Sequence, residues 1–243
     1  MCVCFAVWPW YGPSVMSCVL RRRTRLEREF RPMSTTGKLQ PEFGREHVEI
    51  LSRKPLHAGY IRVDELILRH RLFAGGDSEP FRRELITRPR GAGILLYDPD
   101  RREAVLARQF RIGMIDEPRS PWMLELVAGM VDAGEEPIGV ARRESREEAG
   151  IEPGHVVRIC DYYLSPGVGN ERITLFCGRV DASRAGGIHG LEAENEDIEV
   201  VVVPYDELIE AVETGLINNA MTIIAVQWLQ LHQHEIATLL TPA

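Results

Sequence analysis

Residues 129–151 read GMVDAGEEPIGVARRESREEAGI, a run of charged and small residues bounded by glycine at 129 and isoleucine at 151. Pro137 suits the first position of a helix, and Gly150 suits the left-handed residue just past a helix end. The spacing therefore predicts a helix over Pro137–Ala149.

Three carboxylates of this helix, Glu144, Glu147 and Glu148, share one face. Like charges four residues apart destabilise a helix by a few tenths of a kcal/mol, so their stacking needs a compensating partner. A divalent cation is one such partner, because Mg²⁺ prefers hard oxygen ligands and is commonly shared between carboxylates and substrate phosphates. The pattern therefore indicates a cation site on this helix.

A solvated acidic face is the alternative explanation of the same carboxylates. It is common on helices and would pair them with neighbouring arginines. It does not, however, require Gly129, Glu135 and Gly150 at their particular offsets. The arginines concerned are Arg142, Arg143 and Arg146.

The whole run resembles the signature of the Nudix hydrolases: Gly, five residues, Glu, seven residues, Arg-Glu, an apolar residue, any residue, Glu-Glu, any residue, Gly, apolar. Every fixed position matches except that Ser145 stands where the signature has an apolar residue. This departure concerns the packing of the helix and leaves its carboxylates in place. The resemblance implies a Nudix-type α/β/α sandwich with a mixed sheet.

Composition is that of a soluble enzyme. With 243 residues, 44% of them hydrophobic, the chain can bury a substantial core in one domain or two. The net charge of -7 hides an asymmetry, since residues 1–32 carry +4 and the rest carries -11. This balance does not suggest a nucleic-acid partner.

Residues 1–42 are expected to be an N-terminal extension, either disordered or mis-assigned. A membrane anchor ranks second, because Pro9 and Gly12-Pro13 interrupt the apolar stretch and the positive charges follow it. The five cysteines include no metal-type CxxC pair, which favours reduced thiols in a cytoplasmic protein.

Strand-like and turn-like segments alternate from about Val48, and two further helices follow. The predicted helices are Tyr205–Glu213 and Asn218–His232, and helices covering a mixed sheet make an α/β sandwich. The predicted strands are Val48–Leu51, Tyr60–Phe73, Phe81–Thr87, Ala92–Tyr97, Ala104–Gln109, Met123–Val127, Val156–Tyr163, Ile173–Val180 and Ile198–Val203.

Similarity extends beyond the signature to the bacterial ADP-ribose pyrophosphatase branch, over roughly residues 43–232. It rests on RHRLF, RRELI, QFRI, PWMLELVAGM, SPG, GIHGL, ENEDI, NNA and QWLQLH, and on Pro166, fifteen residues after Ile151. The resemblance implies that residues 43–88 form an antiparallel β region used in dimerisation and that residues 89–238 form the Nudix domain. It also implies a homodimer with exchanged N-terminal strands.

The resemblance assigns a metal site position by position. The backbone carbonyl of Ala128 and the carboxylates of Glu144, Glu148 and Glu196 would bind Mg²⁺, with Mn²⁺ as a substitute. Arg143 and Glu147 would orient these ligands.

A general base would come from the segment GLEAENEDI, residues 190–198. By itself this segment reads as a solvated acidic loop before a strand. The resemblance assigns the role to Glu194, and in some Nudix enzymes a signature glutamate takes it instead.

Substrate-lining positions follow from the resemblance alone. Arg111 would neutralise a phosphate, for which a guanidinium fork is suited, and Tyr60 would stack on adenine. Without the resemblance, Tyr60 would be read as a partly buried strand residue. The remaining matching positions are Arg83, Glu84, Arg88, Met130, Ser165, Gly167 and Glu171.

The implied reaction is Mg²⁺-dependent hydrolysis of ADP-ribose to AMP and ribose 5-phosphate. Another nucleotide sugar, such as GDP-mannose or ADP-glucose, is the alternative within the enzyme class, because the signature recognises the pyrophosphate and not its substituents. A catalytically silent nucleotide sensor is the alternative of a different class. It normally follows loss of signature carboxylates, which are all present here.

Overall fold

A computed structural model describes residues 41–242 of the chain. Most of the predicted extension, residues 1–42, lies outside the described residues. Within residues 41–242, no helix combines the length and the apolar character that crossing a bilayer requires.

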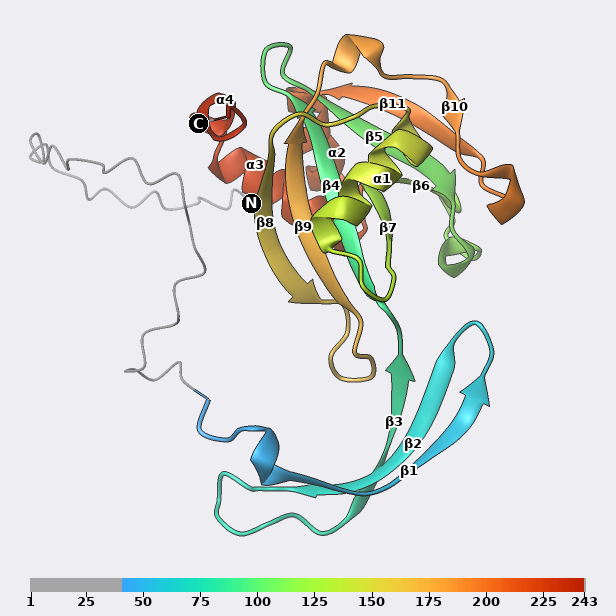
Figure 1. Ribbon diagram of the computed structural model, residues 1–243, viewed down its shortest axis with the longest axis vertical. Coiled ribbons are helices and arrows are strands. Elements are labelled where there is room, and N and C mark those ends of the chain that lie inside the picture. Colours follow the sequence, from blue (N-terminus) through green and yellow to red (C-terminus); the bar gives the residue numbers. More distant parts are fainter. Residues whose placement is uncertain (1–40, 243) are drawn as a thin grey trace, which may run out of the picture. The chain divides into compact units, whose positions relative to one another are not determined.

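The first three strands form an antiparallel sheet in the order β1-β2-β3 (Figure 1), with β1 at Val48–Ala58, β2 at Arg62–His70 and β3 at Phe81–Thr87. Strand β1 runs seven residues past its predicted end at Leu51. It continues through Pro55 because β1 is an edge strand, where a missing N–H is tolerated, and the register shifts just after that proline.

Buried Asp64 organises the middle of this three-stranded sheet. Its carboxylate accepts hydrogen bonds from Arg53 Nε at 2.8 Å and from Arg62 Nε at 3.0 Å. The bonds from Arg53 and then Arg62 hold the pKa of Asp64 below its ordinary value despite burial. One buried acid thus ties β1 to β2.

The remaining strands form an eight-stranded mixed sheet in the order β10-β11-β5-β4-β9-β8, with β6 paired to β5 and β7 paired to β4. Only the β4–β9 pairing is parallel among the pairings described. The strands are β4 Arg90–Asp98, β5 Glu103–Phe110, β6 Trp122–Glu125, β7 Val127–Val131, β8 Val156–Tyr163, β9 Arg172–Arg179, β10 Ile188–His189 and β11 Ile198–Pro204.

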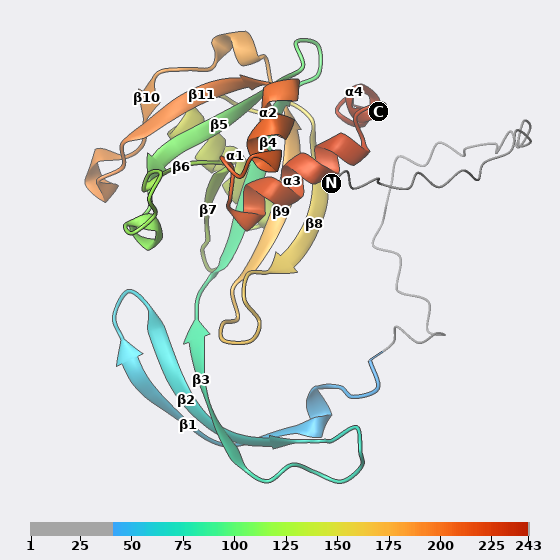
Figure 2. The same cartoon turned by 180° about the vertical axis from the view of Figure 1, so that it is seen from behind.

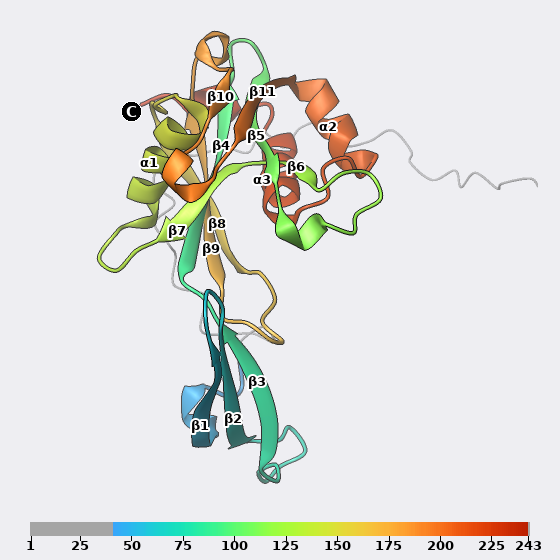
Figure 3. The ribbon, with the colours of Figure 1, turned by 90° about the vertical axis from the view of Figure 1, so that its right-hand side faces the viewer.

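Helices cover both faces of this sheet. Helix α1 (Pro137–Ala149) lies on one face, and α2 (Tyr205–Glu213) and α3 (Ala220–Leu231) lie on the other (Figures 1, 2 and 3). Successive residues of a strand point to opposite faces. Accordingly, Ile94 and Leu96 of β4 pack with Val140 of α1, whereas Leu95 and Tyr97 belong to the cluster that contains α2 and α3. The expected α/β/α sandwich with a mixed sheet and a preceding antiparallel sheet is confirmed.

Helix α1 begins and ends where the sequence predicts. Pro137 is its first residue, and Gly150 adopts φ 63° with its N–H donating to the Arg146 carbonyl. The unexpected Ser145 is fully buried and donates its hydroxyl to the Ala141 carbonyl at 2.6 Å. A polar side chain therefore fits among apolar neighbours because it bonds within its own helix.

Other boundaries differ in places. Helix α2 matches its prediction. Helix α3 (Ala220–Leu231) ends one residue earlier than predicted and starts two residues later, because Asn219 caps its start, its side chain accepting from Thr222 N at 3.0 Å. One predicted strand over Met123–Val127 is two, β6 and β7, which meet at Leu126. The short elements that the sequence did not predict are β10, helix α4 (Ile236–Leu239) and the 3₁₀ turns Arg45–His47, Ile112–Met114, Ala182–Arg184 and Glu192–Glu194.

Candidate functional site

Strand β7 and helix α1 approach each other very closely at Gly129. A Cβ atom at this position would lie 1.8 Å from Glu144 Oε1 and 2.3 Å from its Cδ. The Glu144 side chain therefore occupies the space that any other residue at 129 would need. This explains why the signature begins with glycine.

Glu148 is the most deeply buried acid of the helix, with 3% of its surface exposed. One carboxylate oxygen accepts a hydrogen bond from Ala128 N at 3.1 Å. Burial first, and then the nearby charges of Glu144 and Glu196, raise the pKa of Glu148 to about 8, against the opposing effects of the Ala128 bond and Arg111. The environment disfavours this negative charge in the absence of a compensating cation.

The neighbouring acids share the same electrostatic environment. Burial raises the pKa of Glu144, and Glu147 and Glu196 raise it further, while Arg143 opposes the shift. Three carboxylates from α1 and the segment before β11 thus interact through space. Across the described side chains of residues 41–242, however, no group of three His, Cys, Asp or Glu side chains lies close enough together to coordinate a metal ion.

The donor set nevertheless fits a hard divalent cation. Glu144, Glu148 and Glu196 offer carboxylate oxygens of the kind that such a cation prefers, and burial raises the pKa of both Glu144 and Glu148. A cation bound among them would offset the cost of that burial.

Arg143 is the counter-charge on the exposed side of the helix. Its Nη1 lies 2.7 Å from Glu144 Oε1 and 2.9 Å from Glu147 Oε2, and its Nε lies 3.7 Å from Glu135 Oε1. Arg143 therefore holds three signature carboxylates in fixed relative positions. These contacts are those expected of a residue that orients metal-binding carboxylates without binding the metal itself.

The acidic loop, residues 190–197, lies against the end of α1. Gly190 N donates to the Glu147 carbonyl at 3.3 Å, and Glu196 Oε2 accepts from Leu191 N at 3.1 Å. Glu194 is the last residue of the 3₁₀ turn Glu192–Glu194. Its side chain lies outside the described residues, so the predicted base is placed by its backbone alone.

Arg111 follows strand β5 and pairs with a buried acid that the sequence did not single out. Its Nε donates to Glu125 Oε1 at 2.6 Å. Burial raises the pKa of Glu125, and the charge of Arg111 is the main opposing influence. The positive charge of Arg111 also acts on Glu148, so this predicted phosphate ligand lies near the carboxylates.

Tyr60, Arg88 and Glu171 lie together although they are far apart in sequence. The Arg88 guanidinium carbon is 5.6 Å from the centre of the Tyr60 ring, and Arg88 Nε is 3.4 Å from Glu171 Oε2. The Tyr60 side chain remains 84% exposed. An exposed ring beside a cation offers a surface on which a base can stack.

The other predicted substrate-binding residues have different contacts from the group formed by Tyr60, Arg88 and Glu171. Arg83 packs over Phe81 at 4.6 Å, and Glu84 pairs with Arg82 at 2.8 Å, both on β3. Met130 is 45% exposed on β7, next to Gly129. Ser165 and Gly167 belong to the loop between β8 and β9, where the Ser165 carbonyl accepts from Gly169 N at 2.9 Å.

Two residues that sequence reasoning left without a role brace the β6–β7 junction. Asn219 Nδ2 donates to the Leu124 carbonyl at 3.1 Å, and Thr222 Oγ1 accepts from Leu126 N at 3.2 Å. The capping pattern of Asn219 was readable in the sequence as a helix start. Its second bond, to a strand 95 residues away, was not.

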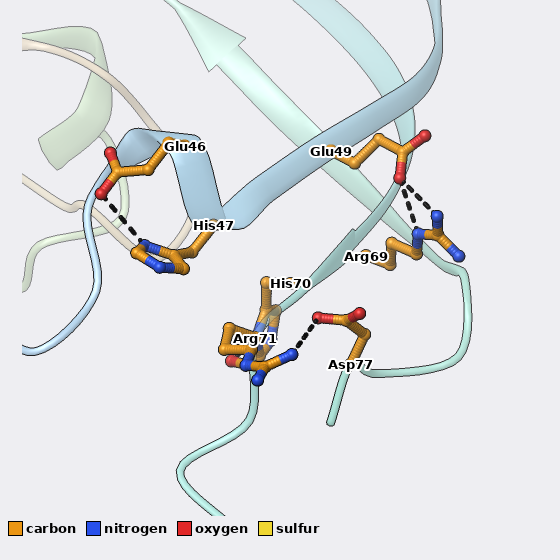
Figure 4. A pocket seen from close by; sticks show the side chains of 7 residues that line it. All are labelled: Glu46, His47, Glu49, Arg69, His70, Arg71 and Asp77. Carbon is orange, nitrogen blue, oxygen red and sulfur yellow. Dashed lines mark hydrogen bonds and ion pairs between the residues drawn. The ribbon is translucent and has the colours of Figure 1, made fainter. Parts of the chain in front are cut away.

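A separate cavity lies on the N-terminal sheet, away from the signature residues in sequence. Its charged side chains form pairs, including Arg69 with Glu49 at 2.7 Å and Arg71 with Asp77 at 3.6 Å (Figure 4). These pairs neutralise one another, so the cavity presents no concentrated charge to a ligand. The lining residues are Glu46, His47, Glu49, Arg69, His70, Arg71 and Asp77.

Known proteins similar to the chain include several that are named pyrophosphatases. The ADP-ribose pyrophosphatase of Escherichia coli (strain K12) is 45% identical over 204 residues, covering 84% of this chain and 98% of that protein. The ADP-ribose pyrophosphatase of Haemophilus influenzae is 42% identical over 197 residues, covering 80% and 91%. The GDP-mannose pyrophosphatase of Escherichia coli O1:K1 / APEC is 34% identical over 172 residues, covering 70% and 83%.

Comparison with solved structures agrees at the level of the fold. A crystal structure of an ADP compounds hydrolase aligns with a TM-score of 0.57 at 18% identity, covering 76% of this chain and 95% of that one. The family model for the NUDIX domain matches residues 87–221, which include the complete signature and the helix that carries it. The chain therefore belongs to the Nudix family of hydrolases.

Proposed function

We propose that the chain hydrolyses ADP-ribose to AMP and ribose 5-phosphate in a reaction that depends on Mg²⁺. The observation that carries this proposal is the buried Glu148, whose negative charge a bound cation would stabilise, in a signature that keeps all its carboxylates. The substrate follows the relatives at 42% to 45% identity that are named ADP-ribose pyrophosphatase.

The proposed ligands of the metal are Glu144, Glu148, Glu196 and the carbonyl of Ala128, with Mn²⁺ able to replace Mg²⁺. When bound, the metal would neutralise diphosphate charge and lower the pKa of a bound water. Arg143 and Glu147 would hold the ligand carboxylates in place through their 2.9 Å pair. Ala128 contributes doubly, because its N–H already anchors Glu148.

Glu194 is the proposed general base. The acidic loop is tied to α1 through the Gly190 bond to Glu147, which keeps the backbone of Glu194 near the signature helix. Glu194→Gln is expected to lower kcat by roughly 10²- to 10⁴-fold while changing Mg²⁺ affinity little. Equal loss of rate and metal affinity would instead make Glu194 a metal ligand.

Substrate binding is proposed at Arg111 for the diphosphate and at Tyr60 for the adenine ring. Arg88 lies over the Tyr60 ring and pairs with Glu171, and both charged residues would line the same binding site. The remaining proposed lining residues are Arg83, Glu84, Met130, Ser165 and Gly167.

A homodimer with exchanged N-terminal strands is part of the proposal, as is a cytoplasmic location. The β1 edge carries exposed apolar residues, with Ile50 40%, Leu51 45% and Leu56 43% exposed. Exposed apolar side chains on an edge strand favour pairing with another chain. Residues 43–88 would then supply the dimer contacts, and residues 89–238 the catalytic domain.

The decisive experiment is steady-state hydrolysis of ADP-ribose, ADP-glucose and GDP-mannose with Mg²⁺ and with chelator. A Mg²⁺-dependent preference for ADP-ribose is expected. A preference for GDP-mannose would favour the second candidate, which the 34% identical GDP-mannose pyrophosphatase supports. Nucleotide binding without turnover of any of them would identify a sensor.

A further inference from the structure

Glu125, at the end of β6, makes a short bond to the arginine proposed for the diphosphate. Its side chain is 12% exposed, whereas that of Arg111 is 44% exposed, and Nε to Oε1 is 2.6 Å. The acid is the buried, fixed member of the pair, and the arginine is the accessible one. Such an asymmetric pair suits an acid that orients an arginine for a third group.

The backbone on either side of Glu125 is held by a single helix start. Asn219 donates to the Leu124 carbonyl, and Thr222 accepts from the Leu126 N–H. Thr222 is fully buried, and Asn219 also caps α3 by accepting from Thr222 N. Glu125 therefore projects from a backbone segment with little freedom to move.

The geometry of the bond leaves the useful part of Arg111 available. The guanidinium bonds Glu125 through Nε, and its terminal Nη1 and Nη2 form the fork that matches phosphate oxygens. The segment that carries Glu125 continues three residues later to Ala128, whose N–H donates to the Glu148 carboxylate. One rigid segment thus connects the arginine to the metal-site helix.

We propose that Glu125 is the positioning residue for Arg111, fixing its guanidinium through Nε so that the terminal amines meet the substrate diphosphate. The inference rests on the proposed function only in taking a diphosphate as the ligand. It adds a role for the acid in the LELVAGM segment, which acts through Arg111 and touches no substrate itself.

A double-mutant cycle tests this role. Glu125→Gln is expected to lower kcat/KM by about 10-fold or more, chiefly through KM, and Arg111→Ala to lower it further. In the Arg111→Ala background, adding Glu125→Gln should change kcat/KM by less than about 2-fold, because the acid then has nothing to orient. Additive losses, or no loss in Glu125→Gln, would overturn the proposal.

The matched control is Glu103→Gln. Glu103 is the first residue of β5 and accepts from Arg101 Nε at 2.7 Å, with its side chain 21% exposed. The Glu103→Gln substitution removes the ion pair with Arg101 and should leave kcat and KM unchanged. If Glu103→Gln lowered kcat/KM as much as Glu125→Gln, the loss would come from a general disturbance of the sheet and would contradict a specific role of Glu125.

A second variant, Glu125→Asp, tests the proposal if the Glu125→Gln protein does not fold. Glu125→Asp keeps the charge but withdraws it by one methylene, so an intermediate rise in KM is expected; an unchanged KM would count against the proposal.

Binding of methylenediphosphonate with Mg²⁺, measured by calorimetry on the same variants, separates this inference from the choice of substrate. Weaker binding in Glu125→Gln and Arg111→Ala, without additivity, supports the positioning role even if wild-type protein does not turn over ADP-ribose. Unchanged binding in Glu125→Gln would overturn it whether or not ADP-ribose is the substrate.

Discussion

The carboxylate of Glu144 fills the space beside Gly129, so close that a Cβ atom there would lie 1.8 Å from Oε1. Strand β7 pairs with β4 and helix α1 packs over it, so neither backbone can withdraw easily. The conflict would have to be resolved by moving the Glu144 side chain. Glycine at 129 therefore sets the position of a proposed metal ligand.

Gly129→Ala is predicted to impair activity more than folding. Glu144 must leave its position, and loss of a positioned ligand should lower kcat/KM by about 10²-fold. The melting temperature should change little, since the side chain that moves is partly accessible. The control is Gly139→Ala in helix α1, where a Cβ would meet nothing within 4 Å, and activity should be retained. Wild-type kinetics in Gly129→Ala would show that Glu144 is not a ligand.

Glu148 predicts how stability depends on pH in the metal-free protein. Its pKa is about 8 in the folded state against an ordinary 4.5, so the folded protein binds this proton more tightly than the unfolded one. The resulting stability is fully present below about pH 4.5 and is lost as pH rises through about 8.

Unfolding by urea in chelator at pH 5.5 and pH 8.5 measures this effect as a fall of a few kcal/mol in the free energy of unfolding. Glu148→Gln should flatten the difference, because the amide does not titrate. Mg²⁺ should restore stability at pH 8.5 in the wild type and not in the variant. Identical pH slopes for the two proteins would rule out Glu148 as the source.

Thr222→Val tests the brace at the β6–β7 junction. Valine keeps the shape but removes the acceptor for the buried Leu126 N–H, at an expected cost of about 1–3 kcal/mol. Calorimetry should show a lower melting temperature, and kcat/KM should fall because Glu125 lies beside Leu126. Thr214→Val is the control, since Thr214 is exposed and bonds only within its own helix end.

Asp64→Asn is predicted to loosen the N-terminal sheet selectively. The amide cannot pair with both Arg53 and Arg62, so hydrogen exchange should quicken in β1 and β2 while β4 and β9 stay protected. Asp77→Asn, which changes an exposed acid 3.6 Å from Arg71, should leave exchange unaltered. Uniform acceleration in all strands would contradict a role confined to this sheet.

Local signals in the sequence were enough to predict α1. Pro137 and Gly150 act through backbone geometry within one turn of the helix, so both ends were placed correctly. The junction at Leu126 was predicted wrongly, because no turn residue in Met123–Val127 marks the point where the chain stops pairing with β5 and starts pairing with β4. That change is fixed by Thr222, which lies far away in sequence.

The candidate site likewise has features that local sequence predicts and features that depend on contacts between distant segments. The spacing of Glu144 and Glu148 follows from helical periodicity, and their shared environment could be anticipated. The pairing of Arg111 with Glu125 could not, since it depends on the register of β5 against β6. The meeting of Tyr60, Arg88 and Glu171 likewise depends on contacts between segments distant in sequence.

The bond from Gly190 N to the Glu147 carbonyl fixes where the acidic loop starts, and strand β11 fixes where it ends at Ile198. Between these two anchors lie Glu194, the proposed base, and Glu196, a proposed metal ligand. A change in loop length would therefore alter the reach of the proposed base in small steps while the carboxylates of α1 stay unchanged. Variants with one residue inserted after Leu191 would sample such intermediates directly.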